Sequence, residues 1–93
     1  MRPHSTAYWI GSCECGQGVL IIRQWINSGN YVIMCDDCES EWKHPDLGDG
    51  NRLPLHSGNR DQNGEIRNST LQEIEALGWD KYIEGNSIDY FCV

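Results

Sequence analysis

Two close pairs of cysteines, separated by 19 residues, are the feature that most restricts the fold of this 93-residue chain. The first pair is Cys13 and Cys15, and the second pair is Cys35 and Cys38. When a β-hairpin joins two such pairs, the turns that carry them come together, and four thiolates then surround one metal ion in a tetrahedron. The spacing therefore predicts a structural zinc site, with these four cysteines as ligands and one Zn²⁺ ion as cofactor.

The size of the chain gives a reason for such a site. A domain of this length has a small core, and metal ligation supplies stability that apolar burial alone does not. The cysteine count is five, which is odd, and no apolar stretch near Met1 has the length of a signal peptide or a membrane span. We therefore expect a cytoplasmic protein with reduced thiols, where paired cysteines hold metal more often than they form disulfides.

The ligand set stays open at this point, because the first pair has only one residue between its cysteines. His4 or His44 can replace Cys13 or Cys15, and disulfides or free thiols are the other interpretations. A site of four thiolates and one Zn²⁺ has a charge of −2 and no open coordination position. This arrangement is typical of a structural zinc and not of a catalytic one.

No catalytic constellation stands out, and we predict that the protein is not an enzyme. His44 and His56 occur in loop-like segments, where a lone surface histidine is more common than an acid–base catalyst. The sequence has no Ser-His-Asp grouping and no phosphate-binding loop. Cys92, the fifth cysteine, lies between Phe91 and Val93 and is interpreted as a small buried hydrophobe.

The distribution of apolar and turn residues predicts one α+β domain, residues 1–93, with a zinc-ribbon-like β-hairpin core and a short antiparallel sheet. Residues 19–26 and 31–35 are rich in β-branched and aromatic residues, and the Asn-Ser-Gly-Asn turn between them favours a hairpin. Residues 8–10 are expected to begin a strand, and the zinc-ribbon-like module covers about residues 8–45. Alternating apolar residues from Ile88 onward predict a further strand.

The second half of the chain is expected to hold one helix, over about residues 70–78. Thr70 and Glu73 match a capping box, Leu71, Ile74 and Leu77 form an apolar stripe, and Gly78 follows as a C-cap. Residues 48–69 are rich in Asp-Gly and Asn-Gly turn formers and are expected to form a variable loop, with room for a short strand.

The net charge of −7 restricts the kind of partner. An acidic chain repels phosphate backbones, which disfavours nucleic acid, and it attracts basic proteins. The alternative is that the acidic residues only keep the domain soluble. Trp25 and Trp79 are expected in the core. The residues predicted to contact a partner are Asp36, Asp37, Glu39, Glu41, Trp42, Asp46, Glu73 and Glu75.

Residues 13–45 resemble a zinc-ribbon module, with Cys13-Glu-Cys-Gly16 as the first knuckle and Cys35-Asp-Asp-Cys38 as the second. The whole chain resembles, in size and charge and not in a motif, the immunity proteins of bacterial polymorphic-toxin and contact-dependent inhibition systems. That resemblance implies a cytoplasmic, non-enzymatic inhibitor that covers a basic, nuclease-type toxin domain. The ribbon by itself implies a regulatory or nucleic-acid-associated adaptor, which the negative charge disfavours.

Overall fold

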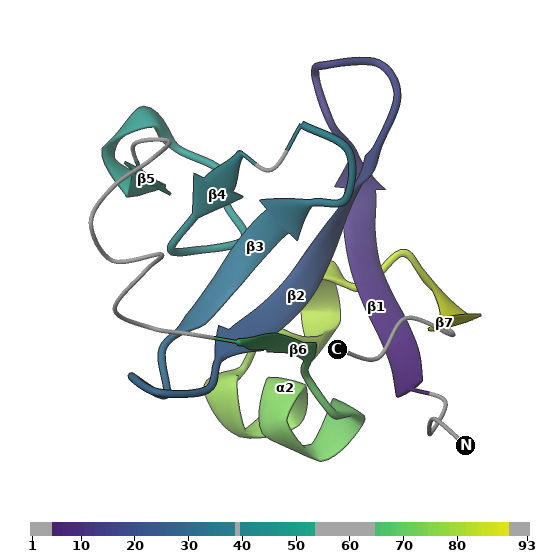
Figure 1. Cartoon of the computed structure of the whole chain (residues 1–93), viewed down its shortest axis with the longest axis vertical. Coiled ribbons are helices and arrows are strands. Elements are labelled where there is room, and N and C mark those ends of the chain that lie inside the picture. Colours follow the sequence, from purple (N-terminus) through teal and green to yellow (C-terminus); the bar gives the residue numbers. More distant parts are fainter. Residues whose placement is uncertain (1–4, 39, 54–64, 90–93) are drawn as a thin grey trace.

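A computed structural model describes residues 5–38, 40–53 and 65–89, and these residues form an α+β fold (Figure 1). The strands are β1 (Ser5–Ser12), β2 (Val19–Trp25), β3 (Tyr31–Cys35), β4 (Glu41–Trp42), β5 (Arg52–Leu53), β6 (Ile66–Asn68) and β7 (Gly85–Asp89). The helical elements are η1 (Asp49–Asn51), the α-helix α2 (Leu71–Leu77) and η2 (Asp80–Tyr82). An antiparallel sheet with one α-helix among the described residues confirms the α+β part of the predicted fold class, and the zinc-ribbon-like core stays a prediction.

The predicted hairpin is present as β2 and β3, and its register fixes the centre of the sheet. Ile22 lies opposite Ile33, and Leu20 lies opposite Cys35. The connecting turn closes through a hydrogen bond of 2.8 Å from the Gly29 amide to the Trp25 carbonyl. Gly29 has a φ of 79°, a left-handed conformation that glycine adopts without the strain of a side chain.

The sheet runs in the order β5-β4-β3-β2-β1-β7, and β6 adds to the β1 side of β2. The strand β1 pairs with the beginning of β2, where Ser12 lies opposite Val19, and β6 pairs with its end, where Trp25 lies opposite Ile66. The strand predicted to begin at residues 8–10 is therefore longer than expected. The predicted C-terminal strand starts at Gly85, and the part of that prediction beyond residue 89 lies outside the described residues.

The helix α2 begins and ends as the sequence predicts. The Glu73 amide donates to Thr70 Oγ1 at 3.2 Å, and the Thr70 amide donates to Glu73 Oε1 at 2.9 Å, which completes the capping box. Gly78 follows the helix with a φ of 76°. The predicted apolar stripe is wrong in part, since Ile74 is buried but Leu71 and Leu77 are exposed.

The core lies on both faces of the sheet because successive side chains of a strand point to opposite sides. Along β3, Ile33 and Cys35 belong to the larger cluster, and Val32 and Met34 belong to the smaller one. The larger cluster also receives Ile74 from α2, and the partly buried Trp79 and Tyr82 pack against it. The short helix thus contributes one fully buried residue, and Trp79 and Tyr82, which follow it in the chain, add partly buried side chains to the same cluster.

Within residues 48–69, where the sequence predicts a variable loop with room for a short strand, the structure describes residues 48–53 and 65–69. These described residues contain η1, β5 and β6, and β5 pairs with β4 at the end of the sheet. Strands of two or three residues have too few positions for an alternating pattern to be detectable in the sequence. No helix among the described residues has both the length and the apolar character needed to cross a bilayer.

Candidate metal centre

Two tight turns carry the four cysteines and lie side by side at one end of the β2–β3 hairpin. The first turn follows β1, and the Cys13 amide donates to the Gly18 carbonyl at 2.9 Å. The second turn follows β3, and the Cys35 amide donates to the Ser40 carbonyl at 3.0 Å. A backbone hydrogen bond also links the two turns, because the Asp36 amide donates to the Val19 carbonyl at 3.1 Å.

Gly18 allows the two turns to approach this closely. A Cβ atom at this position would lie 2.5 Å from Cys35 Sγ and 2.7 Å from Asp36 Oδ1, closer than real side chains pack. The same Asp36 oxygen accepts a hydrogen bond of 3.0 Å from the Val19 amide, so it is held in place. A glycine is required here for a steric reason, and the close approach of the second turn supplies that reason.

The sulfur atoms of all four cysteines lie within 4.8 Å of one another. Cys13 Sγ is 3.6 Å from Cys38 Sγ, and Cys15 Sγ is 3.7 Å from Cys35 Sγ. Four sulfurs at the usual Zn–S distance of about 2.3 Å form a tetrahedron with edges of about 3.8 Å. Both measured separations fit this tetrahedron and far exceed a disulfide bond of about 2.05 Å. The four predicted ligands can therefore hold one metal ion.

The described residues give no support to a disulfide or to His44 as a ligand, and free thiols stay an alternative to metal binding. All four of these cysteines are free, which removes the disulfide interpretation for them. His44 is not part of the cluster, and its ring packs edge-on against Trp79 and Tyr82 with centroids 5.6 and 5.9 Å away. The other alternative ligand, His4, lies outside the described residues, as do His56 and Cys92.

Burial and hydrogen bonds set the protonation of the sulfurs in the metal-free chain. Burial raises the pKa of the Cys13 thiol to about 12, and it also raises the pKa of Cys35. The Cys35 sulfur accepts two backbone hydrogen bonds of 3.4 Å, from the amides of Asp37 and Cys38, but burial outweighs them. A divalent cation reverses this balance, because it binds thiolates and displaces their protons.

Cys38 differs from the two buried thiols. Its pKa is lowered to about 6, first by a hydrogen bond with the Ser40 hydroxyl and then by one with the Ser40 backbone. Cys38 Sγ lies 3.3 Å from Ser40 Oγ. Ser40 accepts a 3.2 Å hydrogen bond at Oγ from Arg52, and neither residue belongs to a motif in the sequence. The two-residue pairing of β4 with β5 brings Arg52 here, and no pattern in the sequence indicates that pairing.

The acidic residues predicted to contact a partner do not form one exposed face. Asp36, Asp37, Asp46 and Glu75 are exposed, and Glu39 lies outside the described residues. Glu41 is only 4 % exposed and accepts a 3.0 Å hydrogen bond from Trp25 Nε1, while Trp42 is 6 % exposed and belongs to the larger core cluster. The prediction is therefore wrong for Glu41 and Trp42, because the short strand β4 places both in the interior.

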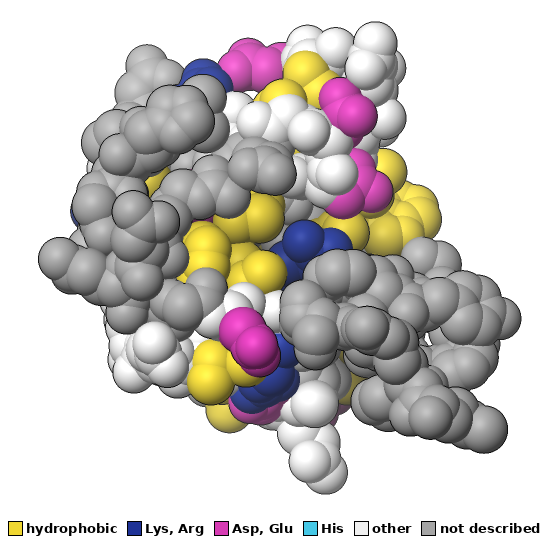
Figure 2. All heavy atoms as spheres, viewed as in Figure 1, with side chains coloured by type: hydrophobic (Ala, Val, Ile, Leu, Met, Phe, Trp, Pro, Cys, Tyr) yellow, Lys and Arg dark blue, Asp and Glu magenta, His cyan; other side chains and the backbone are white. Residues whose placement is uncertain are grey.

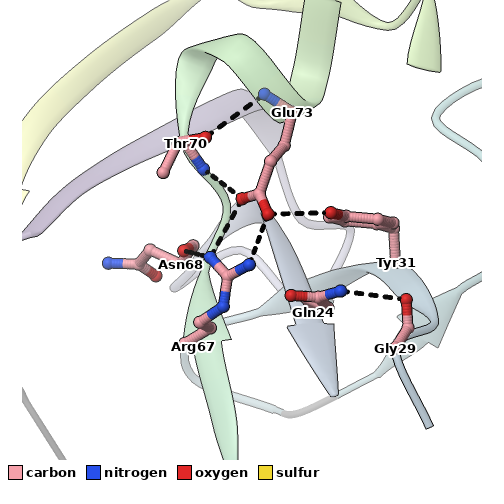
Figure 3. Close-up of polar contacts among 7 residues, drawn as sticks. All are labelled: Gln24, Gly29, Tyr31, Arg67, Asn68, Thr70 and Glu73. Atoms are coloured by element: carbon pink, nitrogen blue, oxygen red, sulfur yellow. Dashed lines mark hydrogen bonds and ion pairs between the residues drawn. The ribbon is translucent and has the colours of Figure 1, made fainter. Parts of the chain in front are cut away.

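Glu73 is also engaged within the chain. Figure 3 shows its carboxylate among Arg67, Tyr31 and the Thr70 amide. Arg67 Nη1 donates to Glu73 Oε1 at 2.9 Å, and Tyr31 Oη donates to Oε2 at the same distance. The Arg67 guanidinium is the main reason that the pKa of Glu73 falls to about 2. This carboxylate joins the helix to the sheet and is already satisfied without a partner.

No protein-family model, curated protein or solved structure matches this chain.

Proposed function

We propose that this protein is a non-enzymatic binding protein whose fold is held together by one structural zinc ion. The observation that carries the proposal is the convergence of four cysteine sulfurs within 4.8 Å, two from each turn. Four sulfurs in a tetrahedron suit zinc or iron, and soft thiolates disfavour magnesium and calcium. A zinc ion with four thiolates has no open position for a substrate, which supports a structural and not a catalytic ion.

The position of the cluster explains what the metal does for the fold. Cys13 and Cys35 are members of the larger core cluster, which also contains Ile74 of the helix. Metal binding at these sulfurs therefore stabilises the same core that the helix covers. In small metal domains, the free energy of zinc binding is also free energy of folding.

The test is the metal content of the purified protein, measured by native mass spectrometry and elemental analysis. We expect one zinc per chain, and we expect Cys35→Ser to lose it. Cys92→Ser is the matched control, because Cys92 is the cysteine that the sequence analysis leaves outside the ligand set. One zinc in the control and none in Cys35→Ser supports the proposal. A wild-type chain without metal, or with an iron–sulfur cluster, contradicts it.

A basic protein partner is the second part of the proposal, and the net charge of −7 supports it. Asp36 and Asp37 are exposed beside Cys35 and Cys38, where a zinc ion with four thiolates adds a charge of −2. Figure 2 shows acidic side chains at separate places on one face, near apolar or basic ones. We expect the partner to contact Asp36 and Asp37 in the turn that carries Cys35 and Cys38.

The narrower role, neutralising a nuclease-type toxin as its immunity protein, rests on the resemblance in size and charge. A toxin gene next to the gene for this chain would supply a partner to test. We expect a tight complex whose association rate falls with salt, because charge steers the encounter. An association rate that does not depend on salt would contradict the charge argument. Binding of DNA or RNA in a mobility-shift titration would favour the adaptor role.

A further inference from the structure

Arg52 connects the two cysteine turns from outside the cluster. Its Nη1 atom donates to Glu14 Oε1 at 3.0 Å, and Glu14 lies between Cys13 and Cys15 in the first turn. Its Nη2 atom donates to Ser40 Oγ at 3.2 Å, next to the second turn. A planar guanidinium has donors on both sides, so one arginine can hold two acceptors in a fixed geometry.

The hydrogen bond from Arg52 to Ser40, here called the Ser40 arm, leads directly to a predicted metal ligand. Ser40 is buried, and its Oγ lies 3.3 Å from Cys38 Sγ. A thiolate has no proton, so with metal bound the hydroxyl donates its single proton to Cys38 and accepts from Arg52 with a lone pair. The hydrogen bond from Arg52 thus polarises the Ser40 hydroxyl, and this hydroxyl donates to the sulfur.

The position of Arg52 is fixed from a third side. Its guanidinium carbon lies 5.1 Å from the ring centroid of Trp42, which is buried in the core next to the cysteine cluster. A guanidinium at this distance from an indole is attracted to the ring face. The Arg52 side chain is 47 % exposed and that of Glu14 is 72 % exposed, so solvent and salt weaken the Glu14 arm more than the Ser40 arm.

We propose that Arg52 and Ser40 form a clasp that positions the Cys38 thiolate, offsets the negative charge of the metal centre and slows the loss of the metal ion. The clasp consists of these two positioning residues, and neither is a metal ligand. This inference rests on the proposed zinc site. Hydrogen bonds to metal-ligating atoms are known to hold ligands in place, and their loss typically lowers metal affinity about 10- to 100-fold.

The experiment measures zinc affinity by competition with a chromophoric chelator, and zinc release after excess chelator is added, at 25 °C. Arg52→Gln and Ser40→Ala are each expected to weaken zinc binding about 10- to 100-fold and to speed release. Arg52→Lys keeps the charge but loses the two-sided geometry, so we expect an intermediate effect. Glu14→Gln removes the exposed arm, and we expect it to have the smallest effect of the four.

Two matched variants control for a general loss of stability. Arg67→Gln removes an arginine whose carboxylate partner, Glu73, lies in helix α2 and not in the cysteine turns. Ser69→Ala removes a buried hydroxyl that has no hydrogen-bond partner among the described residues. Arg67→Gln is expected to lower zinc affinity only by as much as it lowers the stability of the zinc-loaded protein, because it does not touch the cysteine turns. Ser69→Ala is expected to stay within about twofold of the wild type.

Alkylation of the zinc-loaded protein gives a readout that stability alone does not move. In Arg52→Gln and Ser40→Ala, a brief iodoacetamide pulse followed by mass spectrometry is expected to label Cys38 more than Cys35, compared with the wild type. The clasp is overturned if both variants match the wild type in affinity, release and labelling, or if, at equal loss of stability, the controls weaken zinc binding as much as Arg52→Gln and Ser40→Ala do. A wild-type chain that binds no zinc is a separate result, because it refutes the proposed function itself.

Discussion

Two regions of this molecule are held together by different interactions. The cysteine end consists of the turns that carry Cys13, Cys15, Cys35 and Cys38, and the helix end surrounds α2. At the helix end, the carboxylate of Glu73 receives hydrogen bonds from Arg67, Tyr31 and the Thr70 amide, so the side chains satisfy one another. At the cysteine end, four sulfurs converge within 4.8 Å, and burial raises the pKa of both Cys13 and Cys35. The chain alone completes the first arrangement, and the second has the geometry to hold a metal ion.

Side chains converge at both ends of the molecule, but they attract each other at one end and repel each other at the other. An arginine, a tyrosine and a carboxylate placed together attract each other, because donors and acceptors are matched. Four thiolates placed together repel each other, and four thiols gain little from their weak S–H donors. We therefore expect the stability of the cysteine end to depend on whether a metal ion is bound. The following experiments test the two ends one at a time.

Removal of the metal is expected to have the largest effect. A structural zinc ion contributes on the order of 10 kcal/mol in small metal domains, so a strong chelator should unfold the protein. One core cluster contains both Cys35 and Ile74, and we therefore expect the helix to be lost together with the cysteine turns. Circular dichroism and proton NMR spectra before and after chelation measure this. A chelated protein that still unfolds cooperatively would show that the helix end maintains the fold.

Gly18→Ala tests the close approach of the two turns. The added Cβ would overlap Cys35 Sγ and Asp36 Oδ1, so we expect a loss of about 1–3 kcal/mol in the free energy of unfolding and weaker zinc binding. Gly50→Ala is the control, because a Cβ at Gly50 meets nothing within 4 Å. Urea unfolding and chelator competition report both quantities. Equal behaviour of the two variants would contradict the packing described for the turns.

Glu73→Gln tests the helix end, and a smaller effect is expected. The variant loses the ion pair with Arg67 and the charge on the capping box, which should lower the free energy of unfolding by about 1–2 kcal/mol. Glu75→Gln changes an exposed carboxylate of the same helix and should stay within about 0.5 kcal/mol of the wild type. Because the metal-free chain is expected to be unfolded, zinc affinity should fall by the same free energy as the stability does, about 5- to 30-fold in Glu73→Gln and no more than about twofold in Glu75→Gln. A loss of zinc affinity larger than the loss of unfolding free energy would show that Glu73 acts on the cysteine site itself.

Acid should remove the contribution of Glu73 in a defined pH range, and this is the smallest effect that we predict. Its pKa is lowered from 4.5 to about 2 in the folded protein, so its stabilising contribution is complete above pH 4.5 and is lost as the pH falls toward 2. The difference in unfolding free energy between the wild type and Glu73→Gln should be constant from pH 7 to pH 5 and smaller at pH 4. A difference that already shrinks between pH 7 and pH 5 would contradict this ion pair.

The features predictable from the sequence are those with a local pattern. The hairpin follows from two β-rich runs around Gly29, the helix limits follow from Thr70 and Gly78, and the cysteine cluster follows from spacing across that hairpin. Each of these depends on residues within one element or on two neighbouring strands. Short-range chemistry is sufficient to specify them.

The features that the sequence did not indicate depend on contacts between distant segments. The sequence predicts that Glu41 contacts a partner, but in the structure it lies in the interior and accepts a hydrogen bond from the indole of Trp25. Arg52 reaches the metal centre only because β5 pairs with β4, and each of these strands has two residues. Leu71 and Leu77 have helical spacing, yet the helix meets the core through Ile74. Composition and periodicity do not show which segment will cover a given side chain.

X-ray absorption spectroscopy at the zinc edge of the purified wild-type protein tests the central claim most directly. The account predicts a single shell of four sulfur atoms at about 2.3 Å, with no nitrogen or oxygen ligand. A shell that contains nitrogen or oxygen would contradict a site made of Cys13, Cys15, Cys35 and Cys38. A folded protein that carries no zinc would contradict it as well.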